Sequence, residues 1–188
     1  GSDLDTGIGR FYLEASLTDL ARHTEQSSFS LPVAQSQIVI EAIPESGLIR
    51  PGVENILYIL TSYPDGTPAQ TNLSLAFDNQ SSISTETGSY GLAEVHFLPE
   101  NPWLELTISA RDPLGAFAQQ TLYLEGSWED ETVLLRPDKA VYQVGQTMNL
   151  DVLTTASSGR AYLDIVREGQ TVSTRTVTIN DGLGEVAV

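Results

Sequence analysis

Apolar and polar residues alternate along short stretches of the chain, and this alternation predicts β-strands. Phe11, Leu13, Ala15 and Leu17 occupy every second position of one stretch, and a period of two places such residues on one face of a sheet. We expect seven strands between about Gln37 and Trp128. Their ranges are 37–43, 54–62, 71–77, 82–84, 91–98, 103–111 and 117–125.

Turn sequences separate these stretches, and no stretch has the 3.6-residue period of a helix. Pro51-Gly52, "YPDGTP", "TETGSYG", "PENP" and "DPLG" supply the Gly, Pro and Asp residues that tight turns use. Seven short strands with such turns predict an all-β fold, built from tandem immunoglobulin-like antiparallel β-sandwiches.

The alternation recurs at a spacing of 93 residues. Leu13 falls on Leu106, Gly52 on Gly145 and Gly91 on Gly184, and the apolar positions around Leu13 and Leu106 share one phase. A slip of one residue would move every side chain to the other face, so a shared phase indicates a shared architecture. The sequence therefore predicts one β module that is repeated.

The repeat predicts three segments. Residues 1–34 are the C-terminal strands of a preceding module, residues 35–128 form a complete sandwich, and residues 129–188 hold the first five strands of a following module. The two incomplete pieces leave apolar faces that water disfavours. We expect the N-terminal strands to complete the C-terminal half-sandwich, within one chain or across a swapped dimer.

Composition narrows the class of protein. The chain has 188 residues, 40% of them hydrophobic, with a net charge of −16 and a single lysine, Lys139. This charge argues against binding to nucleic acid or to anionic lipid. The absence of cysteine excludes disulfides, thiolate metal sites and cysteine nucleophiles in these residues.

No pair of residues predicts catalysis, and we expect no catalytic, cofactor or metal site. His23 and His96 are the only histidines; we place His23 in a turn and His96 on a solvent-facing strand position. A serine triad needs a nucleophile elbow or an equivalent, and the sequence has none. The chain is therefore expected not to be an enzyme.

Acidic, amide and indole residues offer further candidates. Asp3 starts a partial calcium loop, and Glu129, Asp130, Glu131 and Asp138 could bind calcium, although a solvated hinge is favoured. Asn72 and Asn79 lie in glycosylation sequons, for which no glycan is expected. Trp103 and Trp128 could stack on sugars, but packing at junctions explains them better.

The stretch "DKAVYQVGQTMNLDVLT" (138–154) predicts a short strand at Val141-Tyr142, a reversal at Gly145 and a strand from Met148. Together with "VREGQTV", it resembles the macroglobulin-like domain just upstream of the bait segment in the alpha-2-macroglobulin superfamily. "IVIEAIPESGLIRPGVENILYILTSYPDGTPAQ" and "TETGSYGLAEVHF" resemble the start and a later strand of the domain before it.

This resemblance implies a protease trap. In such proteins a protease cleaves an exposed bait, the ring of domains collapses, and a Cys–Gln thioester can capture the attacker. These residues contain no Cys and end before a bait is expected, so the resemblance implies a scaffold segment of an endopeptidase inhibitor. Its partners are then neighbouring macroglobulin domains and, in the intact protein, proteases.

A tandem repeat of a bacterial surface adhesin or stalk is the alternative function. Either function implies an extracellular or cell-surface protein, periplasmic in a Gram-negative bacterium, and the lack of disulfides favours a prokaryotic source. A thioester motif or a bait in the flanking gene sequence favours the inhibitor, and an array of near-identical repeats favours the adhesin.

Overall fold

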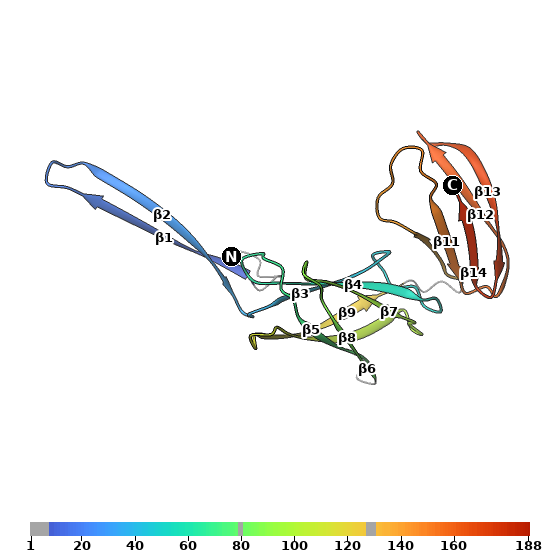
Figure 1. Ribbon diagram of the computed structural model, residues 1–188, viewed down its shortest axis with the longest axis horizontal. Coiled ribbons are helices and arrows are strands. Elements are labelled where there is room, and N and C mark those ends of the chain that lie inside the picture. The colour runs from blue at the N-terminus through green and yellow to red at the C-terminus, as the bar shows by residue number, and fades with distance from the viewer. Residues whose placement is uncertain (1–7, 79–80, 127–130) are drawn as a thin grey trace. The chain divides into compact units, whose positions relative to one another are not determined.

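A computed structural model describes residues 8–78, 81–126 and 131–188, and every element in them is a β-strand (Figure 1). In this part of the chain no helix exists that is long and apolar enough to cross a membrane. The strands are β1 Ile8–Thr18, β2 Thr24–Ala34, β3 Val39–Pro44, β4 Asn55–Ser62, β5 Asn72–Phe77, β6 Ser81–Glu86, β7 Leu92–Phe97, β8 Trp103–Arg111, β9 Phe117–Glu125, β10 Val133–Pro137, β11 Asn149–Thr154, β12 Ser158–Arg167, β13 Gln170–Asn180 and β14 Leu183–Ala187.

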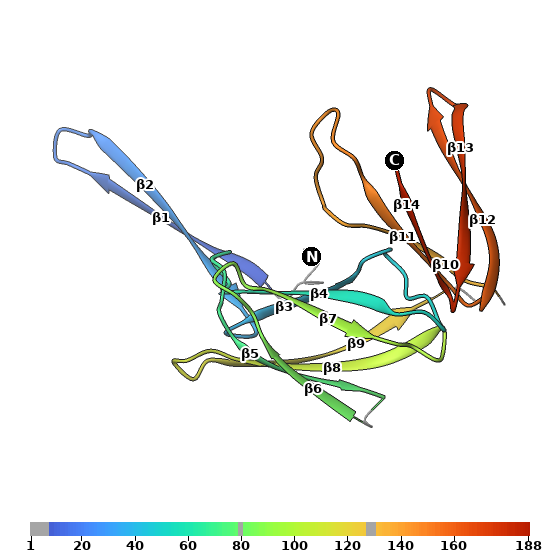
Figure 2. The same ribbon diagram turned by 45° about the vertical axis from the view of Figure 1, so that its right-hand side comes forward.

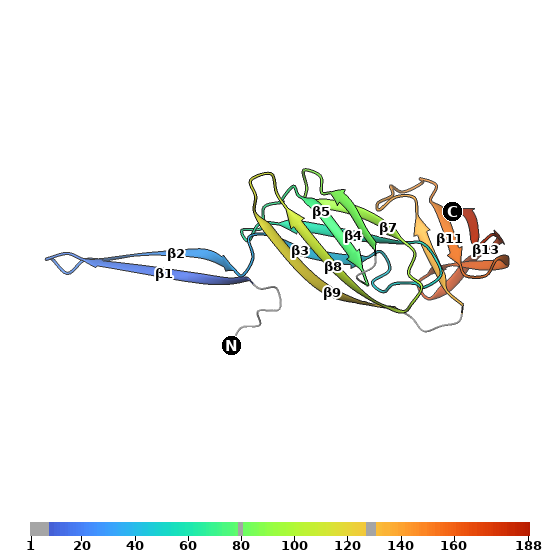
Figure 3. The same ribbon diagram turned by 90° about the horizontal axis from the view of Figure 1, so that it is seen from below.

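The fold is all-β and immunoglobulin-like, as the sequence predicts. Strands β3, β4 and β7 form a three-stranded sheet, and β6, β5, β8 and β9 form a four-stranded one. Figure 3 shows β8 and β9 side by side in the second of these sheets. Strands β8 and β9 begin and end at the predicted residues, and the other five begin and end within two residues of their predicted bounds.

The core follows from the alternation. Strand β5 pairs antiparallel with β8, which places Leu73 opposite Ala110 and Leu75 opposite Ile108. All four side chains are buried. Beside them Thr61, Thr71 and Thr87 are buried too, and the Thr87 hydroxyl accepts a hydrogen bond from the Thr71 N–H at 2.8 Å. Each buried hydroxyl thus has a partner, as burial of a polar group requires.

Strands β1 and β2 form a two-stranded hairpin with all 22 residues of the two strands in register, from Ile8 opposite Ala34 to Thr18 opposite Thr24. At its turn the Asp19 N–H donates to the His23 carbonyl at 2.9 Å, and Arg22 has a φ of 67°. Its apolar residues are exposed, including Leu13 at 56%. The prediction that the C-terminal sheet covers this face, within one chain or across a swapped dimer, stays a prediction.

The last five strands form one sheet in the order β10-β11-β14-β13-β12 (Figure 2). Val152, Val177 and Ile179 make its buried cluster, with Ala161 and Val186 packed against it. Leu150 and Val152 are buried here, so they do not lie on the apolar face that the incomplete C-terminal piece is expected to leave open.

Residues 138–148 form a loop, which corrects the predicted strand at Val141-Tyr142. The Tyr142 hydroxyl accepts a hydrogen bond from the Lys139 N–H and donates one to Asp138, so Tyr142 is held by its own loop. Val141 is exposed. The predicted reversal at Gly145 is confirmed, since Gly145 has a φ of 86° and the Gln146 N–H bonds to the Gln143 carbonyl.

The repeated sequence positions make the same backbone hydrogen bonds, although one predicted pair of equivalent glycines is corrected. Gly91 and Gly182, rather than Gly184, occupy the same place, because the Gly91 carbonyl accepts from the Thr61 N–H and the Gly182 carbonyl accepts from the Thr154 N–H. Both glycines have positive φ, and a Cβ on Gly91 would lie 2.2 Å from the Thr61 oxygen. The stretch around Gly91 therefore recurs at a spacing of 91 residues. Aligning the two copies at 93 residues without a gap pairs Gly91 with Gly184 instead.

By residue contacts the chain divides into two compact units. One contains residues 1–42, 58–93 and 106–122, and the other contains residues 43–57, 94–105 and 123–188. The predicted segment boundaries at 34 and 128 stay a prediction, and the second of them lies outside the described residues.

Candidate functional site

A cluster of charged side chains surrounds Arg136 of β10. The Arg136 Nε lies 2.9 Å from Glu45 Oε2, and its Nη2 lies 2.7 Å from Glu45 Oε1 and 2.9 Å from the Glu54 carbonyl oxygen. Only 17% of the Arg136 side chain and 10% of the Glu45 side chain are exposed. This is the two-pronged pairing of guanidinium and carboxylate, the strong form of ion pair.

Hydrogen bonds with the backbone of Ile56 hold Glu45 in the position in which it contacts Arg136. Glu45 follows Pro44, the last residue of β3, and its N–H donates to the Ile56 carbonyl at 3.0 Å. In return Glu45 Oε1 accepts the Ile56 N–H at 2.8 Å. The carboxylate is therefore held against β4 with one orientation, and the arginine meets a preorganised acceptor.

Glu54 and His96 extend the cluster toward solvent. The His96 Nδ1 lies 2.7 Å from Glu54 Oε1, and the Arg136 Nη1 lies 3.5 Å from the same oxygen. The hydrogen bond from His96, followed by the charges of His96 and Arg136, lowers the pKa of Glu54. The hydrogen bond and charge of Glu45 raise the pKa of Arg136, which stays protonated.

This arrangement connects two segments of chain. The guanidinium donors go to two acids, and in the described ranges every buried side-chain nitrogen or oxygen has a hydrogen-bond partner. Across these same ranges, no three His, Asp or Glu side chains are grouped so that they could hold a metal ion. The cluster serves as a structural link between Glu45 and β10.

Both histidines lie where the sequence predicts. His23 is in the β1–β2 turn, with its Nδ1 3.1 Å from Asp19 Oδ2, and its side chain is exposed. His96 is in β7, on the exposed face opposite to the buried Val95. The contact of His96 with Glu54 has no local sequence signal, because the two residues are 42 positions apart.

The acidic candidates have different outcomes. Asp3, Glu129 and Asp130 lie outside the described residues, and Glu131 is exposed. Asp138 joins its loop to the start of β11, where its Oδ1 accepts the Asn149 N–H at 3.1 Å and its Oδ2 accepts a hydrogen bond from Asn149 Nδ2 at 3.2 Å. The hydrogen bond from Tyr142 contributes most to lowering the pKa of Asp138.

The remaining candidates fall on exposed strand ends or outside the described part. Asn72 is exposed at the start of β5, whereas Asn79 and Trp128 lie outside. Trp103 begins β8 and is 59% exposed, so the prediction that it packs in a junction is wrong. Its neighbour Leu104 points inward, as expected.

Sequence reasoning missed Arg136, Glu45 and Glu54. One signal for Glu45 was present, because the 93-residue spacing places it on Asp138. The two acids make the same contacts: the Glu45 N–H bonds to the Ile56 carbonyl, and the Asp138 N–H bonds to the Asn149 carbonyl. An acid at this position fixes the strand that follows, and in the first copy it also receives Arg136.

No family model and no curated protein matches the sequence. Among solved structures, the chain is similar to the native conformation of Escherichia coli alpha-2-macroglobulin, with 12% identity and a TM-score of 0.38 over 95% of this chain and 14% of that one. It is also similar to a Ca²⁺-stabilised adhesin with which an Antarctic bacterium binds ice, with 13% identity and a TM-score of 0.34 over 95% of this chain and 48% of that one.

A third similar structure is a 1.5-MDa bacterial ice-binding adhesin, with 13% identity and a TM-score of 0.36 over 97% of this chain and 63% of that one. The chain thus spans less than two thirds of each of these structures. Such similarity concerns the arrangement of strands and says nothing about function.

Proposed function

We propose that the chain is a non-enzymatic scaffold segment of a macroglobulin-like endopeptidase inhibitor. The observation that carries the proposal is the repeated module, in which a part-buried ion pair joins one repeat's sequence to the next. Glu45 belongs to the first copy of the repeated position and Arg136 to the strand that opens the second. A trap made of domains needs such links, because its parts must move together when the bait is cut.

The charged residues support a structural rather than a chemical role. Glu45 and Arg136 are part-buried and well paired, and removing one partner of such a pair should cost up to about 3–5 kcal/mol, so their role is in stability. His96 is hydrogen-bonded to Glu54 and His23 to Asp19, at exposed positions. Both histidines thus pair with a carboxylate on the surface, as solvated side chains do.

A repeat of a surface adhesin or stalk is the second candidate, and the regular spacing favours it. The same acid-to-backbone contact recurs at Glu45 and Asp138, 93 positions apart, which suits a rod built from equal units. Either protein works outside the cytoplasm, at the cell surface or, in a Gram-negative bacterium, in the periplasm.

The full natural protein that contains this chain provides the test. It is mixed with an endopeptidase, and the remaining activity is measured on a large protein substrate and on a short peptide. A trap excludes substrates by size, so we expect digestion of the protein substrate to stop while cleavage of the peptide continues.

The chain of residues 1–188 alone is the control and should inhibit neither reaction, because a bait and a cage are not among its expected parts. Unchanged digestion of both substrates by the full protein, together with its adsorption to cells or ice, would favour the adhesin.

A further inference from the structure

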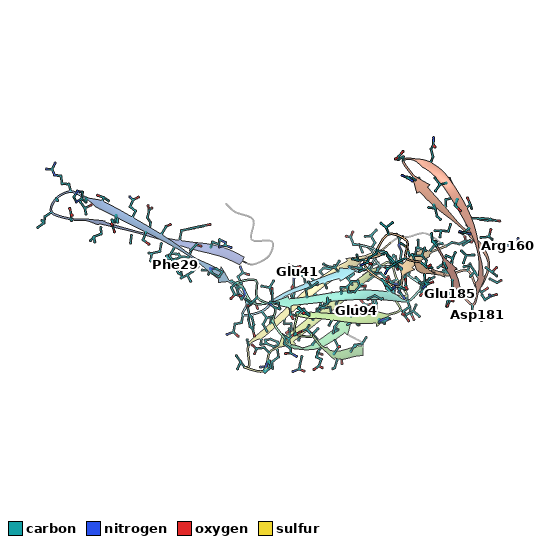
Figure 4. The ribbon with its side chains drawn as sticks, turned by 45° about the horizontal axis from the view of Figure 1, so that its top comes forward. Phe29, Glu41, Glu94, Arg160, Asp181 and Glu185 are labelled. Carbon is teal, nitrogen blue, oxygen red and sulfur yellow. The ribbon has the colours of Figure 1, made fainter. Side chains whose placement is uncertain are left out.

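The β1–β2 hairpin has one apolar face and one polar face. Its register places Phe11 opposite Leu31 and Leu13 opposite Phe29 on the same side of the ribbon. The side chain of Phe29 projects from the hairpin in Figure 4. We call this set the hairpin face, and its exposed members are Phe11, Leu13, Ala15, Leu17, Phe29 and Leu31.

The molecule itself shows how such a hairpin is covered. By the 93-residue repeat, β1 and β2 correspond to β8 and β9, and Leu13 corresponds to Leu106. Leu106 is fully buried, because β8 is paired with β5 and contributes to a sandwich core. Among the described residues β1 pairs with β2 alone, and a strand equivalent to β5 would fit its second edge.

The five-stranded sheet contains a strand of this kind. Its order β10-β11-β14 repeats the order β3-β4-β7, and the β12–β13 hairpin takes the place of β5–β6. In the described ranges β12 pairs with β13 alone and ends the sheet, so its other edge is free where β5 would receive β8. On its inner side, Ala161, Leu163 and Ile165 are only half-buried.

The distribution of charge allows these two parts to meet. Residues 8–34 have two arginines and three carboxylates, a net charge of −1, and residues 133–188 have five cations and six carboxylates, also −1. Residues 35–132 have two arginines and fourteen carboxylates, a net charge of −12. Electrostatic repulsion between copies is therefore concentrated in residues 35–132, which contribute neither the hairpin nor the five-stranded sheet.

We propose that the hairpin of one copy completes the five-stranded sheet of a second copy. Strand β1 adds antiparallel to the open edge of β12, and the hairpin face covers Leu163 and Ile165. Each copy has one hairpin to donate and one edge to receive it, so copies join head to tail or close as a swapped dimer. This inference is independent of whether the parent protein is an inhibitor or an adhesin.

Sedimentation equilibrium of the 188-residue chain tests the proposal. We expect the apparent mass to rise above the monomer value of 20.3 kDa between about 1 and about 200 µM, the range in which weak specific complexes form. The Leu13→Lys variant places a charge in the hairpin face and should lose association at least about tenfold. Tyr12→Lys, on the opposite face of β1, is the matched control and should associate as the natural chain does.

A pair of variants distinguishes loss of binding from loss of folding. Leu13→Lys keeps an intact β12 edge, and Ile165→Lys keeps an intact hairpin, so each alone is monomeric and an equimolar mixture should form a 1:1 heterodimer. Recovery of association on mixing requires both chains to be folded.

Several outcomes would overturn the proposal. They are a constant monomer mass, equal association of Leu13→Lys and Tyr12→Lys, a mixture that stays monomeric, and a monomer whose β1 amides are protected from exchange. The last of these would mean that the hairpin is covered within its own chain.

A gain of function provides a further readout. In the complete sheet the Tyr63 hydroxyl donates to Asp112 Oδ2 at 2.8 Å, and by the repeat Asp19 corresponds to Asp112 and Ala156 to Tyr63. Ala156→Tyr should supply the missing donor to Asp19 of the second copy and strengthen association a few-fold. Association that is unchanged or weakened would place the hairpin turn somewhere other than beside residue 156.

Discussion

The hairpins β1–β2 and β8–β9 have the same pattern of residues and the same turn, but only one of them is buried. Leu13 is 56% exposed and Phe11 55%, whereas the corresponding Leu106 and Leu104 are 0% and 7% exposed. Alternation therefore determines which side of a strand is apolar, and a neighbouring strand determines whether that side is covered. Strand β8 has β5 as a second neighbour, and in the part of the chain that the structure describes β1 has β2 alone.

The turns of the two hairpins are built by one device. Asp112 Oδ1 accepts the N–H groups of Leu114 and Ala116 at 2.9 and 2.8 Å, and Asp19 Oδ1 accepts the His23 N–H at 2.9 Å. Asp112 is buried and also receives the Tyr63 hydroxyl, while Asp19 is exposed. The aspartate shapes the turn in both places and joins the core in one.

The largest effect is expected at the corresponding leucines. Leu106→Ala removes a fully buried side chain and should lower the free energy of unfolding by about 2–5 kcal/mol. Leu13→Ala removes an exposed one and should change it by less than about 0.5 kcal/mol in dilute solution. Urea unfolding of both variants measures the contrast, and equal losses would break the comparison.

The second effect concerns the turn aspartates. Asp112→Ala removes the acceptor of two backbone N–H groups and of the Tyr63 hydroxyl, and should clearly lower the thermal midpoint of the four-stranded sheet. Asp19→Ala should leave that midpoint unchanged, because its partners are exposed residues of the β1–β2 turn. Calorimetry of both variants is the measurement, and a larger loss for Asp19→Ala would contradict the comparison.

A smaller effect is expected where the turns differ in residue type. Gly115 has a φ of 94°, and a Cβ there would meet nothing within 4 Å, while the hairpin has Arg22 at the same position with a φ of 67°. Gly115→Arg should therefore cost only about 1 kcal/mol, the strain of a left-handed conformation. A loss several times larger, measured by urea unfolding, would show that the turns are not equivalent.

The smallest effect is a dependence on pH. The hydrogen bond from Tyr63 lowers the pKa of Asp112 below its ordinary value of 3.8, so its contribution to stability is complete above that value and is lost as the pH falls through the lowered pKa. Tyr63→Phe removes this cause. The difference in thermal midpoint between the natural chain and the Tyr63→Phe variant should narrow between pH 5 and pH values of about 2 to 3. A constant difference would contradict the conclusion that Tyr63 lowers the pKa of Asp112.

Strand positions could be predicted because burial imposes a period of two on each strand. Strands β8 and β9 match their predicted ranges, since Leu104, Leu106 and Ile108 alternate without interruption. Residues 138–148 could not be predicted, because Val141 and Val144 are exposed apolar residues in a loop that Asp138 organises. An isolated apolar pair has the same local pattern in a strand and in such a loop.

The contact between Arg136 and Glu45 could not be predicted from the sequence, for a different reason. Arg136 and Glu45 are 91 residues apart, and neither interrupts the apolar pattern of its own segment. Their contact depends on how residues after β3 meet β10, which no local period encodes. Trp103 shows the converse case, because a large indole suggests burial but begins its strand on an exposed position.

Hydrogen exchange of the backbone amides in β1 and β8 tests most directly whether the two hairpins share a pattern and differ in their partner. In dilute solution we expect β8 amides to exchange only through global unfolding and β1 amides to exchange orders of magnitude faster through local opening. At high concentration the β1 amides should become protected while those of β8 do not change. Equal protection of β1 and β8 in dilute monomer would contradict this account.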